Sequence, residues 1–422
     1  MMPRVAVPLL LLSAVCFAQT PKDVRAVAKD GQSAIPTVAK YLNSAALDTR
    51  LETVKQLIQL GGKDTIDPLI LATRDADPEM QIRATDGLVN YYLPGYVKTG
   101  LGSSIVRAGN SIKSKFSDSN DQIVDPFVIV RPEVIAALGQ LARAGNGMDP
   151  RANACRAIGV LRGRDALPAL VEALRTKDNN VMYESLAAME KIRDPSAGPQ
   201  IVYLLRDLDD RIQSIAIETT GVLRTHEALP ALRSIVASPR NNKSARAALS
   251  AIAMMPEPAD HALLQGNLAS KDEKLRASAA EGLGRLGNAA DLPVIEKAWQ
   301  EPDNKMLPRL AAAFALVMEG KLDLADDAPF RYLINTLNQA SYKDVATAYL
   351  TEAARQKPVL AALYGLLEQG TRDEKIQLAR VLSASGDQSS VPLLDKLSRD
   401  TDKEVAQEGL RSLRSLRARL GV

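Results

Sequence analysis

The apolar positions of this sequence recur at a fixed interval of 31 or 32 residues. One series of apolar residues runs through Leu161, Ile192, Leu223, Met254 and Leu286. A second series keeps the same steps at Leu170, Ile201, Leu232, Leu263 and Ile295. Prolines follow in register at Pro168, Pro199, Pro230 and Pro293, with His261 in the slot between the last two. A period of this length is typical of stacked-repeat proteins, in which each unit buries its apolar face against its neighbours.

Each period contains two helical patterns. In residues 34–42 (AIPTVAKYL) and 48–60 (DTRLETVKQLIQL), apolar residues lie three and four positions apart, which is the helical spacing. Asp77 precedes a second-helix pattern and is expected to cap it. Pro308 lies inside such a pattern and predicts a kink or a shift of the helix start. The sequence therefore predicts an all-α protein, an α-solenoid of about eleven antiparallel helix pairs with one irregular insertion.

Two segments carry a more specific pattern, in which an acidic turn residue is followed by an apolar-Arg-Ala triplet and later by Gly-Leu. They are residues 77–88 (DPEMQIRATDGL) and 271–287 (KDEKLRASAAEGLGRLG). This pattern resembles the HEAT repeat, in particular the short bacterial form also called the phycobilisome-lyase HEAT-like repeat. The resemblance implies a curved superhelix with the second helices on its concave face. It also implies acid–base ladders between adjacent units, with these candidate members: Asp77 with Arg83, and Asp272 with Arg276.

Residues 1–18 are typical of an export signal. The single charge of Arg4 precedes an apolar run, and Ala18 provides the small residue that a cleavage site requires. Cleavage after Ala18 would place the mature protein in the periplasm or outside the cell. Lipid attachment at Cys16 is the alternative, and the bulky Val15 before it fits that processing site poorly.

The remainder of the chain divides into three parts. They are N-terminal repeats at residues 19–90, an irregular insertion at 91–131, and a main repeat array at 132–422 that ends in a basic capping helix. The insertion is rich in glycine, and only one short helix is expected within it, over residues 103–116. Aromatic and arginine side chains often dominate interface energetics. We therefore predict these protein-binding candidates: Tyr91, Tyr92, Tyr96, Arg107 and Phe116. The alternative is that the insertion packs on the solenoid and covers a face.

Charge argues against nucleic acid as a partner. The formal net charge of +3 falls to +2 once the signal and its Arg4 are removed, and so small a charge gives no reason to expect nucleic-acid binding. No apolar run after the signal reaches the roughly 18 residues that a transmembrane helix needs. Four arginines crowd the last helix: Arg411, Arg414, Arg417 and Arg419. We interpret them as a polar capping surface, with peripheral contact to anionic lipid as the alternative.

The residues that usually carry chemistry are sparse. Cys155 is the only cysteine left after signal cleavage, and we expect it to be a buried packing residue. The two histidines are His226, beside Glu227, and His261, and both are expected to face solvent. Deoxyhypusine hydroxylases, which share the repeat, bind two irons through several His-Glu pairs, whereas this sequence has one such pair. We predict no catalytic residues, no metal site and no cofactor.

These observations favour an exported, non-catalytic scaffold or protein-binding module whose partner is a protein or peptide. Two alternatives remain open. One is a HEAT-like lyase or metal-dependent oxidoreductase, which the shortage of histidine disfavours. The other is a peripheral membrane protein of the cell envelope.

Overall fold

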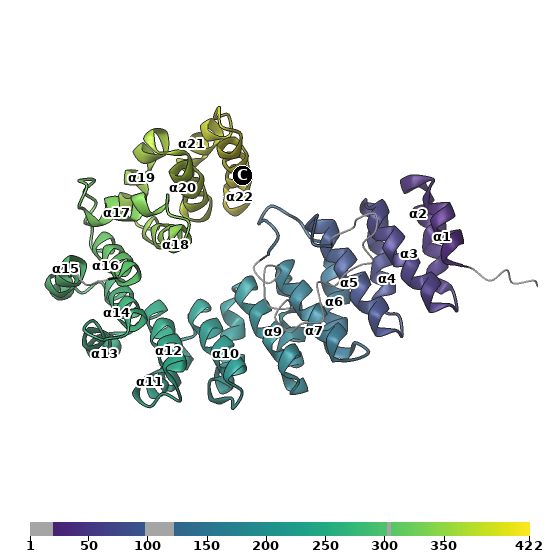
Figure 1. Ribbon diagram of the computed structural model, residues 1–422, viewed down its shortest axis with the longest axis horizontal. Coiled ribbons are helices and arrows are strands. Elements are labelled where there is room, and N and C mark those ends of the chain that lie inside the picture. Colours follow the sequence, from purple (N-terminus) through teal and green to yellow (C-terminus); the bar gives the residue numbers. More distant parts are fainter. Residues whose placement is uncertain (1–19, 98–121, 302–304) are drawn as a thin grey trace, which may run out of the picture.

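The computed structural model describes residues 20–97, 122–301 and 305–422, and these form a curved stack of helix pairs (Figure 1). The first helices of the pairs are α2 (Ile35–Ala39), α4 (Ile66–Ala72), α6 (Pro132–Ala144), α8 (Leu167–Ala173), α11 (Leu229–Ala237), α13 (His261–Asn267), α15 (Leu292–Gln300), α17 (Pro329–Thr336), α19 (Lys357–Gln369) and α21 (Ser390–Leu397). The second helices are α3 (Leu47–Leu60), α5 (Pro78–Tyr92), α7 (Met148–Val160), α9 (Asn179–Ile192), α10 (Asp210–Val222), α12 (Asn242–Met254), α14 (Glu273–Leu286), α16 (Met306–Met318), α18 (Lys343–Ala353), α20 (Arg372–Ser385) and α22 (Lys403–Leu420). These elements confirm the predicted all-α solenoid.

Two units depart from the simple pair. The unit that ends in α10 begins with two 3-10 segments, Pro195–Gln200 and Val202–Arg206, in place of an α-helix. Pro199 lies inside the first segment and lacks the N–H group that a regular helix would use there. At the N-terminus, a lone helix, α1 (Pro21–Ala28), packs against α3.

At the start of most of the second helices, a side chain caps the helix by accepting its first backbone N–H groups. The Asp77 carboxylate accepts the N–H groups of Glu79 and Met80 at 2.9 and 3.0 Å, as predicted. Aspartates cap four further second helices: Asp178, Asp209, Asp272 and Asp402. Helix α16 begins at Met306, so Pro308 lies in its first turn, where no intrahelical N–H bond is lost. The predicted shift of the helix start is therefore confirmed.

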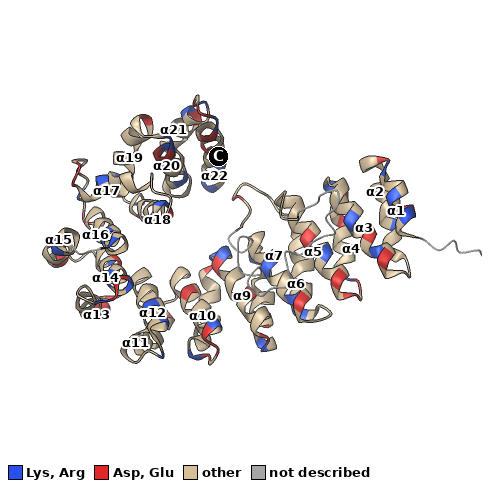
Figure 2. Cartoon of the chain, viewed as in Figure 1, with Lys and Arg blue, Asp and Glu red and all other residues tan. Residues whose placement is uncertain are grey.

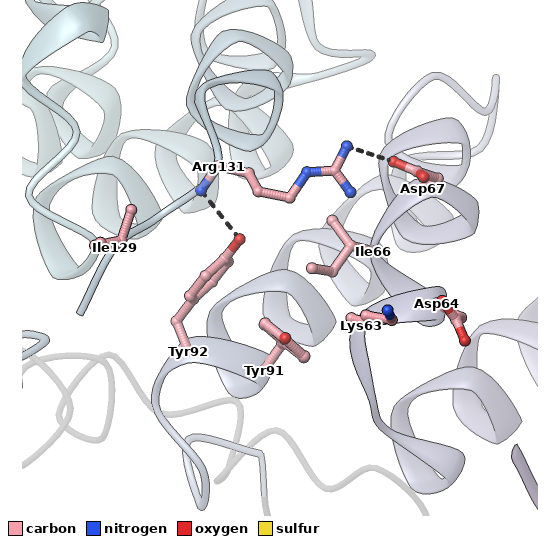
Figure 3. Close-up of a pocket in the computed structure, with 8 residues that line it drawn as sticks. All are labelled: Lys63, Asp64, Ile66, Asp67, Tyr91, Tyr92, Ile129 and Arg131. Atoms are coloured by element: carbon pink, nitrogen blue, oxygen red, sulfur yellow. Dashed lines mark hydrogen bonds and ion pairs between the residues drawn. The ribbon is translucent and has the colours of Figure 1, made fainter.

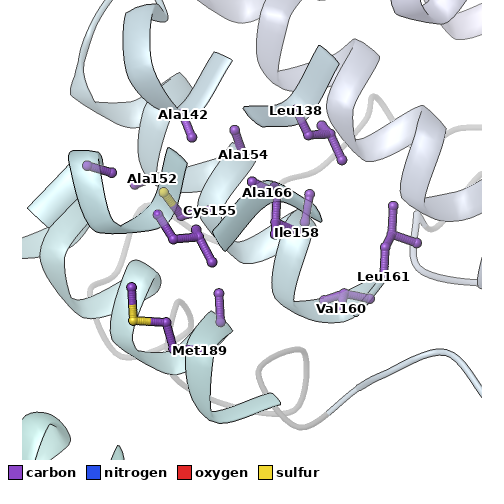
Figure 4. Packing of buried hydrophobic residues seen from close by; sticks show 14 of the residues in the cluster. Leu138, Ala142, Ala152, Ala154, Cys155, Ile158, Val160, Leu161, Ala166 and Met189 are labelled. Atoms are coloured by element: carbon purple, nitrogen blue, oxygen red, sulfur yellow. The ribbon is translucent and has the colours of Figure 1, made fainter. Parts of the chain in front are cut away.

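The core is a thin layer of aliphatic side chains between the helices of each pair and between neighbouring pairs. Figure 4 shows part of it, in which alanines of α7 lie beside Leu138, Ile158 and Met189. Cys155 belongs to this layer and is fully buried, which confirms its predicted packing role. Small side chains allow the helices to approach closely, which suits a molecule with few aromatic residues.

The stack curves so that the second helices of its C-terminal half lie on the inner side and α22 returns toward the middle of the chain (Figure 1). The Arg411 guanidinium of α22 donates to the carboxylate of Asp125, just before α6, at 2.6 and 2.8 Å. Acidic and basic residues are interspersed along the described helices (Figure 2). None of the helices described is long and apolar enough to cross a membrane.

The acid–base ladder between units exists and includes Asp272, whose partner is an arginine of the preceding unit, whereas Arg83 pairs with Glu79 of its own helix. Asp272 accepts from Arg246 of the preceding second helix, with Nη2 2.5 Å from the carboxylate. Arg50 pairs in the same way with Asp75 at 2.8 Å. Arg276 also donates to the backbone carbonyl of Ser270 at 2.8 Å. In both pairs the carboxylate is fixed in the turn by a backbone N–H, since Asp272 caps α14 and Asp75 accepts the N–H of Asp77.

Candidate functional site

The predicted aromatic candidates that the structure describes lie at and just after the end of α5. The Tyr91 and Tyr92 rings meet edge to face, with centroids 4.8 Å apart. The backbone N–H of Arg131 donates to the Tyr92 hydroxyl at 3.1 Å, which ties the end of α5 to the start of α6. Burial raises the pKa of Tyr92, so the phenol is neutral at ordinary pH. Both tyrosines are half-buried and pack against the core.

Tyr91 and Tyr92 line an open pocket of about 370 Å³ between the starts of α4 and α6 (Figure 3). Lys63, Asp64 and Asp67 form one wall, and Ile66 lies at the base. The complete lining is Lys63, Asp64, Ile66, Asp67, Tyr91, Tyr92, Ile129 and Arg131. The pocket therefore combines an aromatic surface with charges of both signs.

Two side chains dominate the rim of this pocket. Arg131 is held by Asp67 across the pocket at 2.8 Å and by Glu133 at 3.2 Å (Figure 3). Ile129 is 90% exposed although it is an aliphatic residue. An exposed aliphatic group beside aromatic rings and a fixed guanidinium is the arrangement that protein-binding surfaces use.

The other three candidates lie apart from this pocket or outside the described structure. Tyr96 is half-buried, packs against the core and is hydrogen-bonded to Arg156, and burial raises its pKa. Arg156 in turn pairs with Glu184 of α9 at 2.5 Å. Arg107 and Phe116 fall within residues 98–121, outside the described residues, as does most of the helix expected over 103–116. The export signal at residues 1–18 is also outside them.

Sequence reasoning missed a polar network on the inner face that joins α14 to α18. Arg285 donates to both oxygens of Glu352 at 2.9 and 2.8 Å and to Glu281 at 3.1 Å. The Tyr349 hydroxyl donates to Glu281, and the Tyr349 ring stacks on Phe314 at 4.7 Å. These residues are separated by as many as 71 positions, from Glu281 to Glu352, so no local pattern could have revealed the network.

The histidines are held in ion-pair geometry with carboxylates of the next unit. His226 Nδ1 lies 3.3 Å from Glu257, and its side chain is 58% exposed. His261 Nε2 lies 2.8 Å from Asp291, and its side chain is only 33% exposed, so the solvent-facing prediction was wrong for this residue. His261 is the first residue of α13, and its ring contacts Asp291 of the following unit. Within the described ranges, no three His, Cys, Asp or Glu residues are grouped as a metal site would require.

The C-terminal arginines are partly used within the fold. Arg411 pairs with Asp125, and Arg419 donates to the carbonyl oxygens of Ser383 and Gly386. The remaining two, Arg414 and Arg417, are exposed on α22. The polar-cap interpretation accounts for the second pair, whereas Arg411 also connects distant parts of the chain.

Comparison with known proteins finds a family match over part of the chain and several similar proteins. Residues 135–219 match the family model of HEAT repeats. Phycocyanobilin lyase subunit alpha of a Nostoc species is 27% identical over 173 residues, and the match spans 38% of this chain and 63% of that protein. A solved complex of CpcE and CpcF of phycocyanin lyase from Nostoc is 21% identical, with 65% of this chain and 94% of that chain covered and a TM-score of 0.37. Importin beta is 12% identical, with 95% and 64% covered and a TM-score of 0.36.

Proposed function

Because this chain is a HEAT-repeat protein, we propose that it is an exported, non-catalytic scaffold that binds a protein partner. The pocket lined by Tyr91 and Tyr92 is the proposed anchor site. Its volume of about 370 Å³ is at the low end for ligand pockets, which suits one side chain of a partner better than a large cofactor. The pocket supplies the residue types that are enriched at anchor sites, namely tyrosine and arginine.

The observation that carries this proposal is the exposure of Ile129. Ile129 is 90% exposed and lines the same pocket as Tyr91 and Tyr92, the only two adjacent tyrosines of the described chain, so a partner side chain in that pocket would cover it. Burial of such a side chain on binding would stabilise a complex by roughly 1.5–3 kcal/mol.

Leu208 provides a matched control for Ile129, since it is also 90% exposed but lies in the turn before α10. The mature protein would be used for affinity capture from the cell envelope as wild type, Ile129→Ser and Leu208→Ser. We expect Ile129→Ser to retain at most about one tenth of the captured partner, and Leu208→Ser to retain all of it. Equal capture by all three forms would remove the pocket from the proposal. Absence of any partner for the wild type would reject the scaffold function itself.

Export is part of the same proposal. Expression of the full chain with a C-terminal tag, followed by fractionation and N-terminal sequencing, tests it. The expected mature N-terminus is Gln19, and a cytoplasmic protein that begins at Met1 would refute it.

A second candidate, a subunit of a bilin lyase, is favoured by the similarity to phycocyanobilin lyase subunit alpha. A lyase subunit would bind the bilin it handles. Addition of phycocyanobilin to the purified protein, followed by absorption spectroscopy, separates the candidates. An unchanged bilin absorption spectrum is expected for a scaffold, whereas a red-shifted, saturable absorption band would establish that the protein is a bilin lyase subunit.

A further inference from the structure

Three arginines occupy one position in three consecutive repeats. Arg162, Arg193 and Arg224 are 31 residues apart and follow the last turns of α7, α9 and α10. Each has a left-handed backbone, with φ of 52°, 57° and 52°. Farther along the array, Gly287 and Gly320 adopt this conformation at the equivalent turns, with φ of 64° and 86°. We call the three residues the arginine ladder.

The backbone of these turns does not require arginine. After α7, the N–H of Gly163 closes the turn onto the carbonyl of Ile158 at 2.9 Å, and the residue before it must be left-handed. Glycine meets that requirement without strain, whereas any side chain brings Cβ close to the following carbonyl oxygen. A cation at a helix C-terminus recovers part of this cost. The identical choice in three successive repeats nevertheless points to a role for the guanidinium groups.

One member of the arginine ladder already binds a carboxylate within the fold. Arg224 donates to Glu352 of α18 at 3.1 Å, across the inner side of the solenoid and 128 positions away in the sequence. At the other end, the charge of Asp125 acts to raise the pKa of Arg162, and Asp125 is itself paired with Arg411. Arg224 therefore binds the carboxylate of a distant segment, and the charge of a second carboxylate, Asp125, acts on Arg162.

The centre of the ladder has no such carboxylate. Arg193 is exposed and makes no ion pair with any residue that the structure describes. The Nε of Arg162 is buried without a hydrogen-bond partner. Burial and the charge of Arg193 lower the pKa of Arg162, in line with their positions on neighbouring turns. Cations on neighbouring turns, with the exposed Arg193 at their centre, form a site for an anionic group.

The chemistry of the surroundings selects carboxylate rather than nucleic acid. Asp165 and Glu227 are exposed on the same turns as Arg162 and Arg224, and they would repel a continuous phosphate backbone. An acidic peptide can place its charges only where the arginines are. Helix α9 packs between α7 and α10, and stacked helices are about 8–10 Å apart. Three residues of extended peptide span about 10 Å, so carboxylates at every third position match the spacing of the ladder.

We propose that Arg162, Arg193 and Arg224 form a docking rim for an extended acidic segment of the partner protein, with one carboxylate per repeat. This inference rests on the proposed scaffold function and names the chemistry of its partner. The central carboxylate meets Arg193 without competition. The one at Arg224 must compete with Glu352, so the fold itself weakens that end of the rim.

The test uses the mature full-length protein and a short fluorescein-labelled peptide with glutamate at every third position. Binding is followed by fluorescence anisotropy at low salt. Arg193→Glu is expected to weaken binding by at least about tenfold, because it replaces an attraction by a repulsion. The matched control is Arg206→Glu, an exposed arginine before α10 but outside the ladder, and no change is expected there.

Three further measurements complete the test. Arg193→Gly retains the left-handed turn and removes only the guanidinium, so it should lose binding without loss of thermal stability. A peptide with glutamine in place of glutamate should not bind, and one with its glutamates in a single block should bind more weakly. Equal effects of Arg193→Glu and Arg206→Glu, or tighter binding of oligothymidine than of the peptide, would overturn the proposal.

The two proposals fail in different ways. A partner that is captured from the envelope by wild type and by Arg193→Glu in equal amount would leave the scaffold function intact and reject the arginine ladder as its site. A partner captured by neither form, together with peptide binding that depends on Arg193, would reject the scaffold function in that envelope and retain the rim.

Discussion

The thiol of Cys155 lies between α7 and α9, where the hydroxyl of Ser185 donates a hydrogen bond to its sulfur atom at 3.3 Å. Burial raises the pKa of this thiol to about 12, and the bond from Ser185 offsets only part of the effect. The thiolate is the reactive form of cysteine, so chemistry at this sulfur requires the helices to separate.

We therefore expect Cys155 to resist modification in the native protein. At about pH 8, Ellman's reagent should react with less than one thiol per chain over hours, and with one thiol at once in guanidinium chloride. The rate in mild denaturant should follow the rate of unfolding. Prompt reaction of the native protein would show that α7 and α9 separate readily.

At the scale of the elements, the second helices are packed closely enough that single atoms limit their approach. A Cβ added to Gly284 of α14 would lie 2.6 Å from the Cα of Ala315 in α16, a contact that backbone atoms cannot relieve. Gly159 and Gly221 meet the next second helix in the same way. Glycine at these positions fixes the distance between repeats.

Gly284→Ala should consequently destabilise the protein by about 1–3 kcal/mol, because α14 and α16 must move apart. Gly266→Ala is the control, since nothing lies within 4 Å of the added Cβ in α13. That change should be neutral or stabilise the helix by up to about 1 kcal/mol. Urea unfolding monitored by circular dichroism measures both, and a similar loss for the two variants would contradict the packing argument.

The polar network between α14 and α18 makes the stability of the protein sensitive to pH. Burial alone would raise the pKa of Glu352, but the hydrogen bond from Arg285 and the charges of Arg285 and Arg224 outweigh it and lower the pKa. A carboxylate whose pKa is lowered in the folded state stabilises the protein at pH values above its unfolded pKa of about 4.3. That stabilisation is lost as the pH falls through the folded pKa.

Glu352→Gln should therefore be less stable than wild type by about 1–3 kcal/mol at neutral pH, since a charged acceptor of a half-buried arginine is lost. The difference in Tm should remain constant down to about pH 5 and shrink below it, because the wild-type carboxylate then becomes protonated as well. A Tm difference that does not change between neutral and acidic pH would show that packing, and not charge, is responsible.

At the scale of the whole molecule, the curvature is held where α22 meets the segment before α6. The Arg411–Asp125 pair joins residues 286 positions apart, and its side chains are 53% and 26% exposed. Exposed pairs of this kind contribute only about 0.2–1 kcal/mol and are screened by salt. The closed arrangement is thus held weakly at this point.

Arg411→Ala should shift the molecule toward a more open superhelix without unfolding any repeat. Small-angle X-ray scattering is expected to give a larger radius of gyration for the variant, and high salt should enlarge the wild type in the same direction. Arg414→Ala, an exposed arginine on the same helix, should leave the radius unchanged. Identical scattering of Arg411→Ala and wild type would mean that packing of the repeats alone sets the curvature.

The sequence by itself determined the class of fold, because the burial that stabilises a solenoid is local and periodic. The series that contains Leu161 and Ile192 marks successive second helices, and prolines and capping aspartates mark the helix starts. The arginine ladder follows this series by one position. Its left-handed backbone is known only from the turn geometry.

Only the tertiary structure decided which distant side chains meet. The contacts of Glu352 with Arg224 and of Asp125 with Arg411 depend on the curvature, which accumulates from small rotations between units that no single repeat encodes. The pocket beside Tyr92 likewise needs the start of α6 to return to the end of α5. The periodicity of the sequence specifies which residues each repeat buries. The small rotations between successive repeats add up to the curvature, and the curvature decides which distant side chains come into contact.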